Sequence, residues 1–103
     1  MEYHDEEDPM WKRLNEYCTG KYMTYSEKRW LVARSLRKHQ DVIEVEDLWI
    51  SLRTQGYQIS LSCVYTSLNI LVEAGVAIVE RENRRNYYMV HPGYTPTSVG
   101  ESP

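Results

Sequence analysis

Residues 60–74 carry a row of side chains that can form hydrogen bonds to another molecule. If this stretch is a helix, its apolar side chains fall within one sector of roughly 100°, namely Leu61, Val64, Leu68, Leu71 and Val72. The opposite side carries Ser62, Thr66 and Asn69, with Tyr65 at the boundary. Such hydroxyl and amide groups can pair with base edges in the major groove of DNA, and a tyrosine can contact a thymine methyl or a phosphate. A face that is only solvated is the alternative interpretation.

Positive charges that could bind phosphate lie outside this stretch, because residues 60–75 contain no lysine or arginine. Two basic groups are candidates: Lys28 and Arg29 at the start of an expected helix, and Arg81, Arg84 and Arg85 around an expected turn. We expect these side chains to supply the electrostatic part of any binding to a polyanion. A solvated basic surface is the alternative for both groups.

The cysteine and histidine residues show no spacing typical of a metal site. They are scattered along the chain: His4, Cys18, His39, Cys63 and His91. Glycine-rich phosphate loops and the common hydrolase motifs are also absent from the sequence. We therefore expect no metal, no cofactor and no enzymatic activity. Cys63 is interpreted as a packing residue, with a redox-active thiol at a helix start as the alternative.

Local patterns predict four helices, at residues 10–18, 24–38, 45–55 and 60–74, followed by a β-hairpin at 76–90. The second helix is expected to begin with a capping box from Thr24 to Glu27, and the fourth with Ser60 as its N-cap. The hairpin is expected to turn at residues 82–85, and Ile43 to add a short third strand. These elements can bury their apolar faces only against one another. The predicted fold class is mainly α with a small β-hairpin, a winged helix-turn-helix.

Length and charge favour one small domain with extensions. The chain has 103 residues and a net charge of −3, but five of its 15 acidic side chains lie in the first eight residues. We therefore expect an acidic flexible arm at residues 1–9, the folded domain at 10–91 and a flexible tail at 92–103. The arm is either solvated or folds over the basic surface and competes with DNA. No apolar run predicts a membrane span or a signal peptide, so a cytoplasmic protein without a membrane partner is expected.

The stretch from Ile59 to Val76 resembles the recognition-helix segment of the ferric uptake regulator (Fur) family. That segment reads Ile-x-Leu-Ala-Thr-Val-Tyr-Arg-x-Leu and then Leu-x-x-Ala-Gly, against ISLSCVYTSL and LVEAG here. Further likeness lies at Met23-Thr24 with Arg29, at residues 46–49 and at residues 86–88. The resemblance covers about residues 20–90. It implies a DNA-binding domain of a transcription regulator, with the recognition helix at about 60–74 in the major groove and the wing at about 76–90 on the backbone.

Some positions depart from the family pattern. Thr66 replaces the family's arginine, Tyr25 its proline, and Ser62-Cys63 its Ala-Thr pair. The family's histidine-rich and Cys-x-x-Cys segments have no counterpart after the wing. The resemblance therefore implies the N-terminal winged-helix domain only, without metal sensing or the dimerisation domain. Double-stranded DNA is the expected partner, and a homodimer would have to use the tail or the first helix near Trp11 and Leu14.

A winged helix that binds a protein instead of DNA is the alternative function. The lack of basic residues in the fourth helix and the negative net charge of the chain favour this alternative. If Arg29, Arg81, Arg84 and Arg85 lie on the same face as the fourth helix, DNA binding is favoured. If Glu73, Glu80 and Glu82 neutralise that face, the protein-binding alternative is favoured.

Overall fold

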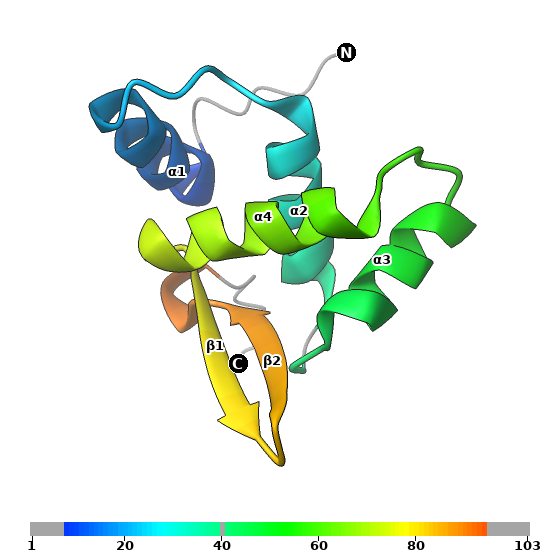
Figure 1. The fold of residues 1–103 in the computed structure, drawn as a ribbon. Coiled ribbons are helices and arrows are strands. Elements are labelled where there is room, and N and C mark those ends of the chain that lie inside the picture. Colours follow the sequence, from blue (N-terminus) through cyan, green and yellow to red (C-terminus); the bar gives the residue numbers. More distant parts are fainter. Residues whose placement is uncertain (1–7, 40, 95–103) are drawn as a thin grey trace, which may run out of the picture.

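The computed structural model describes residues 8–39 and 41–94, which form four helices and a β-hairpin. The elements in chain order are α1 (Pro9–Gly20), α2 (Glu27–Lys38), α3 (Val45–Thr54), α4 (Leu61–Glu73), β1 (Ala77–Glu82), β2 (Arg85–Val90) and a short 3₁₀ helix (Pro92–Tyr94). In Figure 1, α4 crosses α2, α3 lies beside the first half of α4, and the hairpin extends beyond the helices. The predicted fold class, mainly α with a small hairpin, is confirmed. Among the described helices, none is long and apolar enough to cross a lipid bilayer.

The core forms where the apolar faces of α2, α3 and α4 meet the base of the hairpin. Its fully buried members include Val32, Leu36, Leu48, Leu52, Val64, Leu68, Leu71, Val76 and Val90. Leu61 and Val72, expected on the inward face of α4, are only half-buried at the edge of that face. Burial of each large aliphatic side chain stabilises the fold by about 1.5–3 kcal/mol. The helical periodicity of the sequence therefore identified the packing face of α4 correctly.

Side-chain caps set the starts of three helices. Ser60 accepts a hydrogen bond from the Cys63 amide at 3.1 Å, as expected for the N-cap of α4. The capping box predicted from Thr24 to Glu27 is wrong, because the N-cap of α2 is Ser26, which accepts from the Arg29 amide at 3.2 Å. The Thr24 carbonyl instead accepts a hydrogen bond from the Arg29 guanidinium. Helix α2 thus begins at Glu27, and its N-cap lies two residues later than predicted.

The wing is a tighter hairpin than the sequence indicated. Its register pairs Ala77 with Val90 at the base and Glu82 with Arg85 at the tip. Only Asn83 and Arg84 lie in the turn, both with positive φ (53° and 69°), as in the two-residue turns that match strand twist. The predicted four-residue turn was therefore too long by one residue on each side. Ile43 exchanges two backbone hydrogen bonds with Tyr88, but this is an isolated bridge, so the sheet has two strands and the expected third strand is reduced to one residue.

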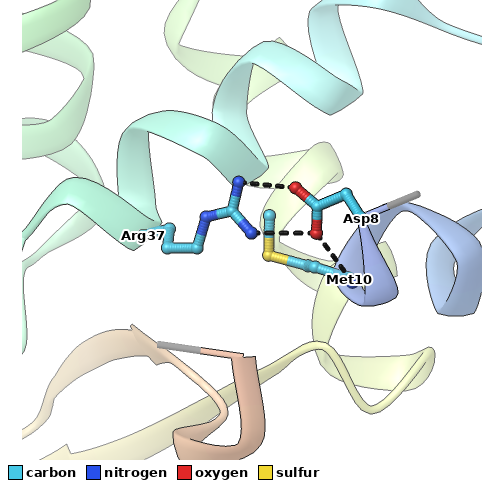
Figure 2. A network of polar contacts seen from close by, with 3 residues as sticks. All are labelled: Asp8, Met10 and Arg37. Atoms are coloured by element: carbon cyan, nitrogen blue, oxygen red, sulfur yellow. Dashed lines mark hydrogen bonds and ion pairs between the residues drawn. The ribbon is translucent and has the colours of Figure 1, made fainter. Parts of the chain in front are cut away.

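Helix α1 is attached through polar contacts at both of its ends. At its start, Asp8 caps the helix and accepts two hydrogen bonds from Arg37 on α2, at 3.0 and 2.8 Å (Figure 2). The Asp8 and Arg37 side chains are only 10% and 21% exposed. Asp8 and Pro9, which we expected in the flexible arm, thus belong to the folded domain. The rest of the acidic arm, residues 1–7, and most of the expected tail, residues 95–103, lie outside the described residues.

The C-terminus of α4 is contacted by Arg13, midway along α1, and by Tyr17, in the last turn of α1. The Arg13 Nε donates to the Ala74 carbonyl at 2.7 Å, and the Tyr17 hydroxyl donates to Glu73 at 2.6 Å. Leu14 is buried in the core. The prediction that Leu14 could contribute to a dimer interface is therefore wrong. Trp11 is half-buried against the same core.

Candidate nucleic-acid interface

The turn between α3 and α4 holds the two helices in a defined orientation. Gly56 follows α3 with a φ of 98°, a left-handed conformation that glycine adopts without strain. Ile59 is buried, and its carbonyl accepts a hydrogen bond from the Trp49 indole at 2.9 Å. Because the turn is fixed to α3 in this way, the start of α4 at Leu61 is fixed as well. This is the helix-turn-helix predicted from the sequence.

The exposed side of α4 carries the polar side chains that we singled out as candidates. Ser62, Tyr65, Thr66 and Asn69 are all exposed. Tyr65 is 45% exposed, which places it at the border of the face as expected. Within the described part of the chain, the side chains of Tyr65, Thr66 and Asn69 form no hydrogen bond, and Ser62 lies 3.4 Å from the Ser60 hydroxyl only. The donors and acceptors of this face are therefore available to another molecule.

A crevice joins this face to the wing. It has a volume of about 330 Å³, and its walls come from the start of α3, from α4 and from β2: Glu44, Val45, Glu46, Tyr65, Arg85, Asn86 and Tyr88. Burial raises the pKa of the Tyr88 hydroxyl above its ordinary value. The tertiary structure thus places Tyr65 of α4 and Arg85 of the wing at one site.

The three arginines of the wing have different surroundings. Arg81 donates to the Asn86 amide oxygen at 3.1 Å across the hairpin. Arg85 donates to both carboxylate oxygens of Glu44, at 3.3 and 3.1 Å, and this hydrogen bonding raises the pKa of its guanidinium. Arg84, at the tip, is exposed and forms no polar contact with any described residue. The wing therefore presents one unengaged cation and two that already have partners.

The two basic residues of α2 also differ. Lys28 is exposed, whereas Arg29 is half-buried between α1 and α2. The Arg29 guanidinium donates to the Thr24 carbonyl at 3.2 Å and to the Cys18 sulfur at 3.4 Å. It is not among the residues that line the crevice with Tyr65. Arg29 instead holds the α1–α2 connection in place, so it does not join Arg85 at this crevice.

Sequence reasoning missed one basic residue near the start of α4. The Arg53 guanidinium lies 5.5 Å from the centre of the Trp49 ring. Arg53 is exposed and shares an open groove of about 500 Å³ with the turn residues Tyr57 and Gln58 and with the N-cap Ser60. A positive charge is therefore present beside the N-terminus of α4, where the helix dipole also favours an anion. The one-turn spacing of Trp49 and Arg53 was the sequence signal that could have identified it.

The described residues do not form a metal site. Across residues 8–39 and 41–94, no three His, Cys, Asp or Glu side chains lie close enough together to hold a metal ion. Cys18 is buried and Cys63 is half-buried, and both are free thiols. His4 lies outside the described residues. The donor groups described here thus do not fit a structural or sensory metal.

Comparison with known proteins agrees with this geometry. The profile of the ferric uptake regulator family matches residues 21–92. The ferric uptake regulation protein of Rhizobium leguminosarum bv. viciae is 32% identical over 81 residues, which are 77% of this chain and 57% of that protein.

Solved structures show the same fold. The Helicobacter pylori ferric uptake regulator has a TM-score of 0.73 at 21% identity, over 88% of this chain and 61% of its own. A manganese uptake regulator has a TM-score of 0.63 at 29% identity, over 77% of this chain and 59% of its own. This chain therefore spans less than two thirds of the length of each of these relatives. Because the profile covers well over half of the chain, and the Rhizobium protein shares nearly a third of the aligned residues, the chain belongs to the ferric uptake regulator family, whose members are transcription regulators rather than enzymes.

Proposed function

We propose that this domain binds double-stranded DNA and regulates transcription, with α4 in the major groove and the wing along the backbone. The observation that carries the proposal is the exposed polar face of α4 in the second helix of a helix-turn-helix, where the side chains of Tyr65, Thr66 and Asn69 form no hydrogen bond with any described residue. Hydrogen-bonding groups without partners are the ones that a base edge can satisfy. Family membership supports the same function.

On this proposal, α4 reads bases through neutral groups. Asn69 can form paired hydrogen bonds with adenine, Ser62 and Thr66 can each donate or accept, and Tyr65 can pack on a thymine methyl. No guanidinium projects from α4, since the helix contains no arginine or lysine. We therefore expect a preference for A·T-containing positions beneath this helix, because the common pairing of arginine with guanine is absent.

Phosphate contacts come from residues around α4 rather than on it. The exposed cations Lys28, Arg53 and Arg84 are the first candidates, and Arg81 and Arg85 can contribute if they leave their present partners. Three to five such contacts give a salt dependence of about three to four and a half logarithmic units per tenfold change in salt. A single module of this size binds weakly, so we propose that two copies occupy a two-fold symmetric site in the cytoplasm.

Fluorescence anisotropy with labelled duplexes tests the proposal. We expect binding to a mixed-sequence duplex at about 50 mM salt, a marked loss at about 200 mM, and tighter binding to duplexes selected from a random pool. The absence of binding at low salt would contradict the proposal. Affinity that does not change with salt would contradict the phosphate contacts.

A protein-binding role is the second candidate, and the outer side of α3 favours it. Ile50 is 54% exposed there, beside the half-buried Trp49 and the stacked Arg53. Exposed apolar side chains rimmed by polar ones are typical of protein contacts. Duplex binding that is lost on Thr66→Ala but unaffected by Ile50→Ser would separate the two surfaces.

A further inference from the structure

Glu44 lies between Ile43, which forms a bridge to Tyr88 of β2, and helix α3. It occupies the N-cap position of α3, yet its side chain forms no capping hydrogen bond. Instead, both of its carboxylate oxygens accept hydrogen bonds from Arg85 on the wing. The Glu44 side chain is 23% exposed and that of Arg85 is 66% exposed. The carboxylate is thus held against the protein, while solvent and any approaching polyanion can reach the guanidinium.

The crevice around this ion pair is acidic on balance. Glu44 and Glu46 contribute two negative charges, and Arg85 is the one basic residue among those lining the crevice. Tyr65, from the exposed face of α4, lines the same crevice. A DNA backbone that follows α4 and the wing must therefore pass close to a carboxylate that already holds the nearest guanidinium.

We propose that Glu44 sets the strength of DNA binding by competing with phosphate for Arg85. This inference rests on the proposed function, and it assigns to Glu44 a role as a positioning residue that acts through Arg85. Carboxylate and phosphate are both anionic acceptors, and the same guanidinium N–H groups cannot serve both fully. The pair therefore withholds one cation from the backbone and leaves Arg84 as the only wing arginine without a partner among the described residues.

The same geometry limits the size of the effect. An exposed ion pair is weak and is screened by salt, so the competition attenuates binding without abolishing it. The pair should matter most at low salt, where both the Glu44–Arg85 attraction and the attraction of Arg85 to phosphate are strongest.

Substitution of Glu44 by glutamine tests the competition, with a labelled random-sequence duplex as the probe. We expect Glu44→Gln to tighten binding about three- to fivefold at low salt and to steepen the salt dependence by about 0.9. Arg85→Ala in the unmodified chain should weaken binding by less than about twofold. The same change in the Glu44→Gln background should remove the whole gain, because Arg85 is then the group that contacts phosphate.

Glu46→Gln is the matched control. It removes one carboxylate from the same crevice, also in the first turn of α3, but Glu46 forms no ion pair with Arg85. Glu46 acts on Arg85 only through the attraction between their charges, so we expect its effect to be smaller than that of Glu44→Gln and to depend on Arg85 only weakly. Equal gains for the two variants, or a loss of affinity for Glu44→Gln, would overturn the inference while leaving the proposed function in place.

The two proposals fail in distinguishable ways. Absence of duplex binding by the unmodified chain and by every variant would contradict the proposed function, and the inference with it. If Glu44→Gln does not fold, as judged by thermal unfolding, the Arg85→Ala measurement decides alone. A weakening of fivefold or more by that substitution would show that Arg85 already contacts phosphate, and would overturn the inference.

Discussion

The two ends of helix α4 use their polar groups in opposite ways. At the C-terminal end, Ala74 and Glu73 accept hydrogen bonds from Arg13 and Tyr17, residues that lie 61 and 56 positions away in the chain. At the N-terminal end, the hydrogen bonds of Ser60 are local, to Ser62 and Cys63, and the side chains of Tyr65, Thr66 and Asn69 have no hydrogen-bond partner among the described residues. One end is held by the rest of the protein, and the other faces outward.

This difference indicates which polar residues stabilise the fold and which are available for binding. A polar group paired within the protein contributes to stability, and its removal leaves the partner unsatisfied. A solvated group contributes little to stability, so its removal should change binding alone. Substitutions near α1 should therefore change unfolding, whereas substitutions on the exposed face of α4 should change DNA affinity.

The largest effect is expected at Asp8, which both caps α1 and pairs with Arg37. Asp8→Ala should lower the free energy of unfolding by about 2–3 kcal/mol, because it removes the cap and leaves Arg37 without its carboxylate in a partly buried site. Urea denaturation measures this change. Asp8→Asn is the matched control, since asparagine also caps helices. This variant should lose only the part of the free energy of unfolding that comes from the charge of Asp8. Equal stability of all three proteins would show that α1 is not held in this way.

The exposed face of α4 should behave in the opposite manner. Thr66→Ala combined with Asn69→Ala should weaken binding to a selected duplex about tenfold or more, because two sets of base contacts are lost. The free energy of unfolding should change by less than about 0.5 kcal/mol. Thr54→Ala, at an exposed position on α3, provides a control for the threonine half of this variant. A large loss of stability with unchanged affinity would invert the comparison between the two ends of α4.

A smaller effect is expected at the tip of the wing. Arg84→Ala should weaken binding about two- to threefold and reduce the salt dependence by about 0.9, as for one lost phosphate contact. Arg81→Ala should have less effect, since Arg81 is engaged with Asn86. Anisotropy titrations at several salt concentrations measure both. An Arg81→Ala variant that binds more weakly than Arg84→Ala would contradict the assignment of Arg84 as the available cation.

The smallest effect concerns Tyr17 at alkaline pH. Its hydrogen bond to Glu73 raises the pKa of the Tyr17 hydroxyl above its usual 10.0, because the neutral phenol is the form that donates. The stabilisation is therefore complete below pH 10.0 and is lost as the pH rises through the higher value of the folded state. Unfolding of the unmodified chain and of Tyr17→Phe should differ at pH 8 and converge above the folded-state pKa. A difference that persists at alkaline pH would exclude this hydrogen bond as its cause.

Much of the fold could be predicted because its signals are local. The N-cap at Ser60, the left-handed Gly56 and the apolar periodicity of α4 each depend on residues within one or two turns of one another. The two-residue turn at Asn83 and Arg84 is local as well. Because the flanking residues 81–82 and 85–86 are also polar, the sequence did not show where the strands end and the turn begins. The start of α2 was misplaced because Thr24 and Ser26 are both good capping residues, and the structure shows that Ser26 is the one whose hydroxyl accepts a hydrogen bond from the helix, at the Arg29 amide.

The partners of the charged residues could not be predicted. Arg29, Arg84 and Arg85 look equivalent in the sequence. In the structure, Arg29 holds the α1–α2 connection and Arg85 is paired with Glu44. Arg84 is exposed and has no partner among the described residues. Long side chains find partners from distant segments, and spacing along the chain carries no information about those distances. For the same reason, the sequence predicted that Asp8 belongs to a solvated acidic arm, although Asp8 contacts Arg37 in the structure.

The sequence by itself determined the helices, the hairpin and which side of α4 is apolar, because hydrophobic periodicity, caps and turns act over a few residues. Only the tertiary structure decided which of the polar and charged groups are available to bind. That choice depends on which distant segments meet, and an ion pair or a buried hydrogen bond removes a group from the surface whatever its residue type.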